Sequence, residues 1–104
     1  MKRMAFKMKL KPGCADEYKR RHDNLWPELK LLLKQAGIQQ YSIFLDEGTD
    51  TLIAFQGVTG DTGSQELGRN EIVMRWWEYM ADIMLTHPDH SPVSIELPEV
   101  FYMD

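Results

Sequence analysis

Hydrophobic and polar residues alternate at the start of the chain. The apolar positions are Met4, Phe6, Met8 and Leu10, and basic residues occupy most of the positions between them. A period of two with one polar face predicts a half-buried β-strand over residues 3–10. Pro12 and Gly13 are turn residues and end this strand.

A helical composition follows over residues 15–35, and Gly37 marks its C-terminal end. Pro27 lies inside this region. A proline in a helix interior removes one hydrogen bond and clashes with the preceding turn, whereas a proline in the first turn is tolerated. We therefore predict two segments: a short helix that ends near His22, and a second helix over about residues 25–35.

The rest of the chain adds three strands and one helix. Residues 41–45 and 52–58 have the composition of strands, and the hairpin-type loop DEGTD between them predicts antiparallel neighbours. Residues 65–85 have helical spacing and could be interrupted at residues 68–70. Their common face carries Val73, Trp77, Met80 and Met84. Residues 93–102 are strand-like, but Pro98 limits them to a sheet edge, a bulge or an arm.

The order of elements, β-α-β-β-α-β, predicts an α+β fold of the ferredoxin-like type in a single domain over residues 1–104. In that fold a four-stranded antiparallel sheet carries both helices on one face. The other face then has to be polar or covered. Phe44, Ile53 and Phe55 exceed what one core can bury, so we expect a second subunit on the open face.

Composition narrows the class of protein. A formal net charge of −4 argues against a nucleic-acid-binding protein. The apolar runs are too short to span a membrane, and the N-terminal MKRMAFKMKLK has no apolar core like that of a secretory signal. A single cysteine, Cys14, leaves no disulfide within the chain and indicates a reducing cytoplasm.

The stretch YKRRHDNLWPEL holds a candidate acid–base group. Tyr18 and His22 are four residues apart and share one face of the short helix. An imidazole titrates near neutral pH, and the negative end of the helix dipole favours its protonated form. The alternative is that His22 is an ordinary surface histidine at a helix end and Tyr18 a packing residue.

Trp76 and Trp77 are adjacent and point about 100° apart on a helix, so one can lie in the core while the other lines its edge. Indole faces bind the apolar faces of sugars, and the indole N–H can donate to a hydroxyl. The alternative is that both are core residues. Trp26 lies close to His22 in the sequence, and Tyr41 at the start of a strand can bring a hydroxyl to the same place.

Other candidates are weaker. His87, Asp89 and His90 lie in a proline-containing loop without the spacing of a metal site, so we expect no metal. The basic run YKRRH is flanked by acids, which favours a solvated helix face. Cys14 has no visible base partner, and no glycine-rich phosphate loop occurs.

Three stretches together closely resemble the L-rhamnose mutarotase family: EYKRRHDNLWPEL, RWWEYMADIM and SPVSIELPEVFYM. The likeness covers essentially the whole chain, including MKRMAFKMKL and YSIFLD, in the same order and at similar spacing. It implies a homodimer of ferredoxin-like subunits that forms a dimeric α+β barrel. It also implies interconversion of the α and β anomers of L-rhamnose, a small sugar substrate, without a cofactor.

The resemblance carries five site residues onto this chain. The histidine of the RRH motif, His22, corresponds to the proton donor. The residues that correspond to sugar contacts are Tyr18, Tyr41, Trp76 and Trp77. Two departures bear on substrate preference: DHSP stands where DNSP is common, which makes His90 unusual, and residues 59–70 are dissimilar and glycine-rich.

Anomer exchange requires proton transfer only, so we expect protonated His22 to give a proton to the ring oxygen and to take it back on closure. The second acid–base group is open: water, Asp82 or a tyrosine could serve. Two other functions are compatible with this fold: a non-catalytic module that binds a small ligand, and a cofactor-free or haem-linked monooxygenase. The RRH motif and the paired tryptophans favour the mutarotase.

Overall fold

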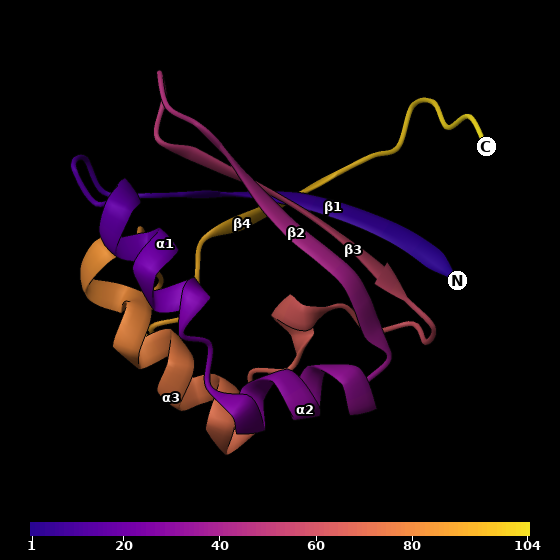
Figure 1. Cartoon of the computed structure of the whole chain (residues 1–104), viewed down its shortest axis with the longest axis horizontal. Coiled ribbons are helices and arrows are strands. Elements are labelled where there is room, and N and C mark those ends of the chain that lie inside the picture. Colours follow the sequence, from indigo (N-terminus) through magenta and orange to yellow (C-terminus); the bar gives the residue numbers. More distant parts are fainter.

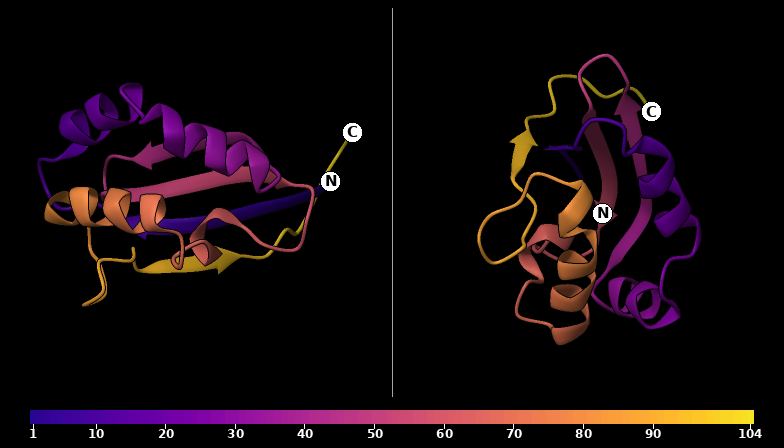
Figure 2. Two further views of the ribbon diagram at one scale, coloured as in Figure 1. Left: turned by 90° about the horizontal axis from the view of Figure 1, so that it is seen from below. Right: turned by 90° about the vertical axis from the view of Figure 1, so that its left-hand side faces the viewer.

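The elements follow the predicted order, with additional short turns. A computed structural model describes all 104 residues. The strands are β1 (Lys2–Lys9), β2 (Ile38–Asp46), β3 (Thr51–Val58) and β4 (Ser94–Leu97); the helices are α1 (Ala15–Asp23), α2 (Pro27–Gln35) and α3 (Glu71–Met80); and the 3₁₀ turns are η1 (Ser64–Glu66) and η2 (Ala81–Ile83). The sheet is antiparallel throughout, in the order β2-β3-β1-β4. The three helices gather on one side of it (Figures 1 and 2). This arrangement confirms the α+β, ferredoxin-like prediction.

The helical region breaks where Pro27 predicted. The α1 helix ends at Asp23, and Pro27 is the first residue of α2, where its missing N–H costs nothing. Trp26, directly before the proline, is extended with ψ of 128°. The break separates two short helices that lie over the same sheet.

The strand β2 begins at Ile38, earlier than the predicted start at Tyr41. A register shift between Gln39 and Ser42, with Gln40 at φ of +50°, marks a β-bulge. The extra residue allows both Ile38 and Tyr41 to face the helices. The two polar glutamines hid this part of the strand from the alternation pattern.

The helix predicted over residues 65–85 is shorter in the structure, where only residues 71–80 are α-helical. The chain forms η1, then α3 with Asn70 as its N-cap, whose side chain accepts from the Ile72 N–H at 2.9 Å, and then η2. The expected interruption at residues 68–70 is confirmed. Trp76 is buried, whereas Trp77, which the spacing placed on the core face, is half-buried. Trp76 lies in the core beside Val73 and Met80.

The last strand is an edge strand, one of the three possibilities that Pro98 left open, and it covers only part of the predicted range 93–102. The β4 strand pairs with β1 and ends at Leu97. Beyond it the chain continues past the N-terminal end of β1 (Figure 1). Arg3 binds the Glu99 carboxylate through two hydrogen bonds of 3.0 and 2.8 Å, and its guanidinium lies 3.4 Å from the centre of the Tyr102 ring.

The sheet face opposite the helices carries exposed apolar side chains. Phe44 and Phe55 are 61% and 45% exposed, and their rings lie 5.8 Å apart. Ile53, which pairs with Phe44, is half-buried, and Ile95 on β4 is exposed. The expectation of surplus apolar residues on an open face is confirmed.

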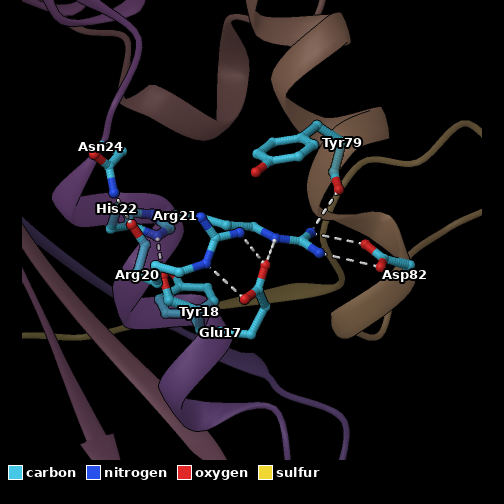
Figure 3. Close-up of polar contacts among 8 residues, drawn as sticks. All are labelled: Glu17, Tyr18, Arg20, Arg21, His22, Asn24, Tyr79 and Asp82. Carbon is cyan, nitrogen blue, oxygen red and sulfur yellow. Dashed lines mark hydrogen bonds and ion pairs between the residues drawn. The ribbon is translucent and has the colours of Figure 1, made fainter.

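Arg21 is buried, so the solvated face predicted for the basic run is wrong at this position. Its guanidinium donates to the Asp82 carboxylate at 2.8 Å, to the Tyr79 carbonyl at 2.7 Å and to the Glu17 carboxylate at 2.7 Å (Figure 3). Arg20 and Arg21 together hold the pKa of Glu17 at about 2. This cluster joins α1 to the end of α3.

Replacing His90 by glycine should stabilise the chain by about 0.5–1 kcal/mol. His90 has φ of +71°, a left-handed conformation that costs free energy for a residue with a Cβ atom, and its side chain is exposed. Urea unfolding of the variant and the wild type measures the difference. His87→Gly is the control: His87 is not left-handed, so there glycine should be neutral or destabilising. An equal gain at both positions would contradict the explanation.

None of the helices is long and apolar enough to cross a bilayer.

Candidate functional site

A cavity of about 920 Å³ lies between the helices and the sheet. Its lining includes all five residues that the sequence singled out: Tyr18, His22, Tyr41, Trp76 and Trp77. They come from α1, from β2 and from α3, so three separate parts of the chain meet around one space. The β-bulge in β2 and the helix break after α1 are the local features that bring them there.

His22 is held in one tautomer. Its ring stacks on Tyr18 with 4.2 Å between ring centres, and its Nδ1 lies 3.1 Å from the Tyr18 carbonyl oxygen (Figure 3). A carbonyl oxygen can only accept a hydrogen bond, so Nδ1 carries a proton. In the neutral ring, Nε2 therefore keeps its lone pair and is free to accept a proton.

Burial lowers the pKa of His22 from its ordinary value of 6.5. The hydrogen bond to the Tyr18 carbonyl and the charge of Asp23 act in the opposite direction but are smaller influences. Desolvation of the imidazolium therefore acts against the protonated ring that the end of the helix was expected to favour. His22 rests in the neutral form at neutral pH.

Aromatic rings hold His22 in place. Trp76 packs edge-on against the imidazole at 5.3 Å between ring centres and 87° between planes. Trp26 packs edge-on against Trp76 at 5.1 Å and stacks on Tyr79 at 5.7 Å. Trp26 supports the cavity wall from behind, since it does not itself line the cavity. Tyr18 therefore contacts His22 directly, as their spacing predicted. Trp26 contacts Trp76, and only Trp76 touches the imidazole.

The two tyrosines stay protonated. Burial raises the pKa of Tyr18 far above its ordinary value, and burial also raises the pKa of Tyr41. Both are therefore neutral phenols at every pH near neutrality, able to donate a hydrogen bond but unable to act as a base. They suit sugar hydroxyl and ring oxygens.

Trp77 lies against a backbone that has no side chain. A Cβ atom at Gly68 would lie 2.6 Å from Cζ3 of the Trp77 ring, closer than such atoms approach. Gly68 belongs to the glycine-rich segment of residues 59–70. That segment therefore shapes the cavity wall at Trp77 rather than forming a detached loop.

Sequence reasoning missed Ser64 and Gln65, which line the cavity, and Gln56, which lies behind Ser64 and binds it. Gln56 and Ser64 are buried and hydrogen-bonded to each other, and the Ser64 hydroxyl lies 3.4 Å from that of Tyr41. A signal for Gln56 exists in the sequence, because it occupies the inward phase of β3 between Ala54 and Val58. Ser64 lies in a loop whose position the pattern could not predict.

Asp82 does not belong to the site. Its carboxylate is bound by Arg21 on the outside of the helices, and it does not line the cavity. Its suggested role as the second acid–base group is therefore excluded by position. No group of three or more His, Cys, Asp or Glu side chains is arranged to hold a metal ion, including around His87 and His90.

Comparison with known proteins gives a consistent result. A family model described as L-rhamnose mutarotase matches residues 3–103. Proteins named L-rhamnose mutarotase from Formosa agariphila and Bacteroides thetaiotaomicron are 64% and 61% identical to this chain over 104 residues, with all of each chain covered. One from Listeria monocytogenes is 50% identical over 103 residues, which is 99% of each chain. A crystal structure of an L-rhamnose mutarotase from Formosa agariphila superposes with a TM-score of 0.93 at 60% identity, again over all of both chains. The chain belongs to the L-rhamnose mutarotase family.

Proposed function

We propose that this protein is an isomerase that interconverts the α and β anomers of L-rhamnose. The family and the names of its relatives support the substrate. The observation that carries the proposal within this chain is His22, a half-buried imidazole with a free Nε2 in an aromatic-walled cavity. Ring opening and closure need one group that exchanges protons near neutral pH, and His22 is placed to do so.

Neutral His22 starts the reaction as a base. Its Nε2 takes the proton of the anomeric hydroxyl while the bond between the anomeric carbon and the ring oxygen breaks. The imidazolium then gives this proton to the former ring oxygen, which leaves a free aldehyde and neutral His22. Rotation about the adjacent carbon–carbon bond and reversal of the steps closes the ring on its other face. We therefore propose a neutral resting His22 in place of the protonated donor expected from the sequence. A lowered pKa favours the neutral imidazole, which is the base of the first step, and makes the imidazolium a stronger acid for the second step.

The other lining residues bind and orient the sugar. The hydroxyls of Tyr18 and Tyr41 donate to sugar oxygens, and both remain protonated through the reaction. Trp76 and Trp77 contact the apolar side of the ring, including the 6-deoxy methyl group. This division leaves proton transfer to His22 alone, so no second acid–base residue is required.

Magnetisation exchange between the two anomeric proton signals of L-rhamnose tests the activity. At anomeric equilibrium, the protein should produce exchange between the signals that is absent from buffer alone. Rhamnose that binds without exchange would instead indicate a non-catalytic ligand-binding module and would overturn the proposal. Exchange with another sugar but not with rhamnose would preserve the reaction and change the substrate.

Activity should fall as the pH drops below about 6.5 and should level off above it. The neutral imidazole is the active form, and burial moves its pKa below the ordinary value, so the midpoint lies on the acid side of 6.5. Exchange rates measured from pH 4.5 to pH 8, with the spontaneous rate subtracted at each pH, check this. Activity that instead declines as the pH rises would show that protonated His22 begins the reaction.

We further propose that the chain is one domain over residues 1–104 that pairs through its open sheet face as a homodimer, a dimeric α+β barrel. The exposed rings of Phe44 and Phe55, continued across β1 and β4 by Ala5, Leu97 and Ile95, support this interface.

The free Cys14 is consistent with a cytoplasmic location.

A charge on the open face should convert the dimer to a monomer. Phe55→Glu places a carboxylate among the apolar side chains of the open face, and burying that charge in an interface is strongly unfavourable. Light scattering coupled to size-exclusion chromatography gives the mass of the wild type and the variant. Leu31→Glu is the matched control, because Leu31 is also an exposed apolar residue, at 56% against 45% for Phe55, but lies on α2. A monomeric wild type, or a dimer that survives Phe55→Glu, would contradict the interface.

A further inference from the structure

A chain of buried polar groups lies beside Tyr41 at the cavity. Gln56, on the inward side of β3, is 3% exposed, and Ser64, the first residue of η1, is 6% exposed. Burying an amide and a hydroxyl is costly unless each finds partners. Both are satisfied here through one another, since no buried side-chain nitrogen or oxygen in the protein lacks a hydrogen bond.

The backbone fixes the orientation of the Gln56 amide. Its Oε1 accepts from the backbone N–H of Ser64 at 2.8 Å, and a backbone N–H can only donate. The other end of the amide, Nε2, therefore faces the Ser64 hydroxyl oxygen, also at 2.8 Å, and donates to it. The loop approaches closely enough for both bonds because residue 63 is glycine: a Cβ atom there would lie 3.0 Å from Oε1 of Gln56.

The Ser64 hydroxyl then has one direction left for its proton. Its oxygen accepts from Gln56 and, at 3.4 Å, from the side-chain nitrogen of Gln65, so both lone pairs are used. Its own O–H is directed at the hydroxyl oxygen of Tyr41, 3.4 Å away. The polarity of the chain therefore runs from Gln56 through Ser64 to Tyr41.

Tyr41 receives this hydrogen bond and has its own proton free. No hydrogen bond within the protein takes the Tyr41 O–H as donor. The residue lines the cavity, and its phenol stays protonated near neutral pH. Its donated proton is thus available to a molecule in the cavity.

We propose that Gln56 and Ser64 are positioning residues that set the Tyr41 hydroxyl as a hydrogen-bond donor to an acceptor oxygen of the sugar. This inference rests on the proposed function, because it concerns the substrate of the same cavity. The inference gives the glycine-rich segment of residues 59–70 a role in substrate recognition. Gly63 lets this segment approach Gln56, and Ser64 accepts a hydrogen bond from Gln56 and donates one to Tyr41. A sugar oxygen that accepts at this point is held by the Tyr41 proton.

Gln56→Glu should reverse the polarity while preserving the shape. A carboxylate can still accept from the Ser64 N–H, but its second oxygen accepts from the Ser64 hydroxyl instead of donating to it. The Ser64 oxygen then accepts from Tyr41, whose proton turns away from the cavity. We expect kcat/KM for rhamnose exchange to fall about three- to tenfold, the usual range for one neutral hydrogen bond.

A double-mutant cycle decides whether Ser64 acts through Tyr41. Ser64→Ala and Tyr41→Phe should each lower kcat/KM by about three- to tenfold, and the double variant should be no worse than Tyr41→Phe alone. Ser64→Thr keeps the hydroxyl and should restore activity. A melting curve for each variant separates loss of folding from loss of the hydrogen bond.

Additive losses in the cycle, or wild-type activity in Ser64→Ala, would overturn the relay while the proposed function stands. A wild-type protein without rhamnose exchange would instead overturn the proposed function. In that case the same cycle is measured as rhamnose affinity, from the change in tryptophan fluorescence on titration with the sugar. Non-additive losses of affinity would support the relay, and additive losses or unchanged affinity would reject it.

Discussion

His22→Gln should lower the rate of rhamnose anomer exchange by roughly 10²–10⁴-fold, the usual contribution of one positioned acid–base group. Glutamine is close to histidine in size, and its amide can donate to the Tyr18 carbonyl as Nδ1 does now. It cannot take up or release a proton near neutral pH. The variant should therefore keep the cavity and the fold while losing the proton transfer that opens the ring.

Magnetisation exchange between the anomeric protons measures the loss, and rhamnose binding should change little. His87→Gln is the matched control, since His87 is exposed in the loop after η2 and does not line the cavity. That control should retain the wild-type rate. Wild-type exchange in His22→Gln would remove His22 from the mechanism and leave the cavity as a binding site.

Trp76→Ala should lower the free energy of unfolding by about 3–5 kcal/mol, the cost of truncating a buried tryptophan to alanine. Trp76 is 7% exposed and touches His22, Trp26 and Tyr79 with its ring. Its removal leaves a void where α1, α2 and α3 meet. For a chain of this size the melting temperature should fall by more than about 10 °C.

Urea unfolding and a thermal melt measure the effect, and Trp77→Ala is the control on the adjacent position. Trp77 is only half-buried, so its truncation should cost clearly less stability although both rings line the cavity. Exchange should weaken in both variants, and in Trp76→Ala His22 also loses the ring that packs against it. Equal stability losses would contradict the assignment of Trp76 to the core and Trp77 to its edge.

The amino-acid sequence by itself determined the order of elements and most of their places. Alternation at residues 3–10 marked β1, because a strand on a core must bury every second side chain. Pro27 marked the helix break, because its ring is compatible only with a helix start. The surplus of Phe44, Ile53 and Phe55 indicated an open apolar face, since helices on one side cannot cover both. These are local rules of geometry and composition, which hold wherever the chain folds.

The candidate site was predicted only in part. Spacing placed Tyr18 with His22, residue chemistry singled out Trp76, Trp77 and Tyr41, and the resemblance gave these residues their roles at the sugar. Spacing put Trp77 on the apolar face with Val73 and Met80 and left open which of the two tryptophans lies in the core; the folded chain buries Trp76 and leaves Trp77 at the edge. Asp82 was wrongly included as a candidate base, since only the folded chain shows it bound to Arg21 outside the cavity.

Tertiary structure alone decided the charge state and the partners of the site. Burial among rings that are distant in sequence lowers the pKa of His22, whereas the sequence showed only the local end of a helix, which favours the charged ring. Burial of Arg21 likewise required acceptors from α1 and from the far end of α3. The contact from Gln56 through Ser64 to Tyr41 joins β3, η1 and β2, and each bond in it depends on distances that no local pattern encodes. Burial and long-range hydrogen bonding are properties of the assembled fold, and they set the chemistry of residues whose positions the sequence had already indicated.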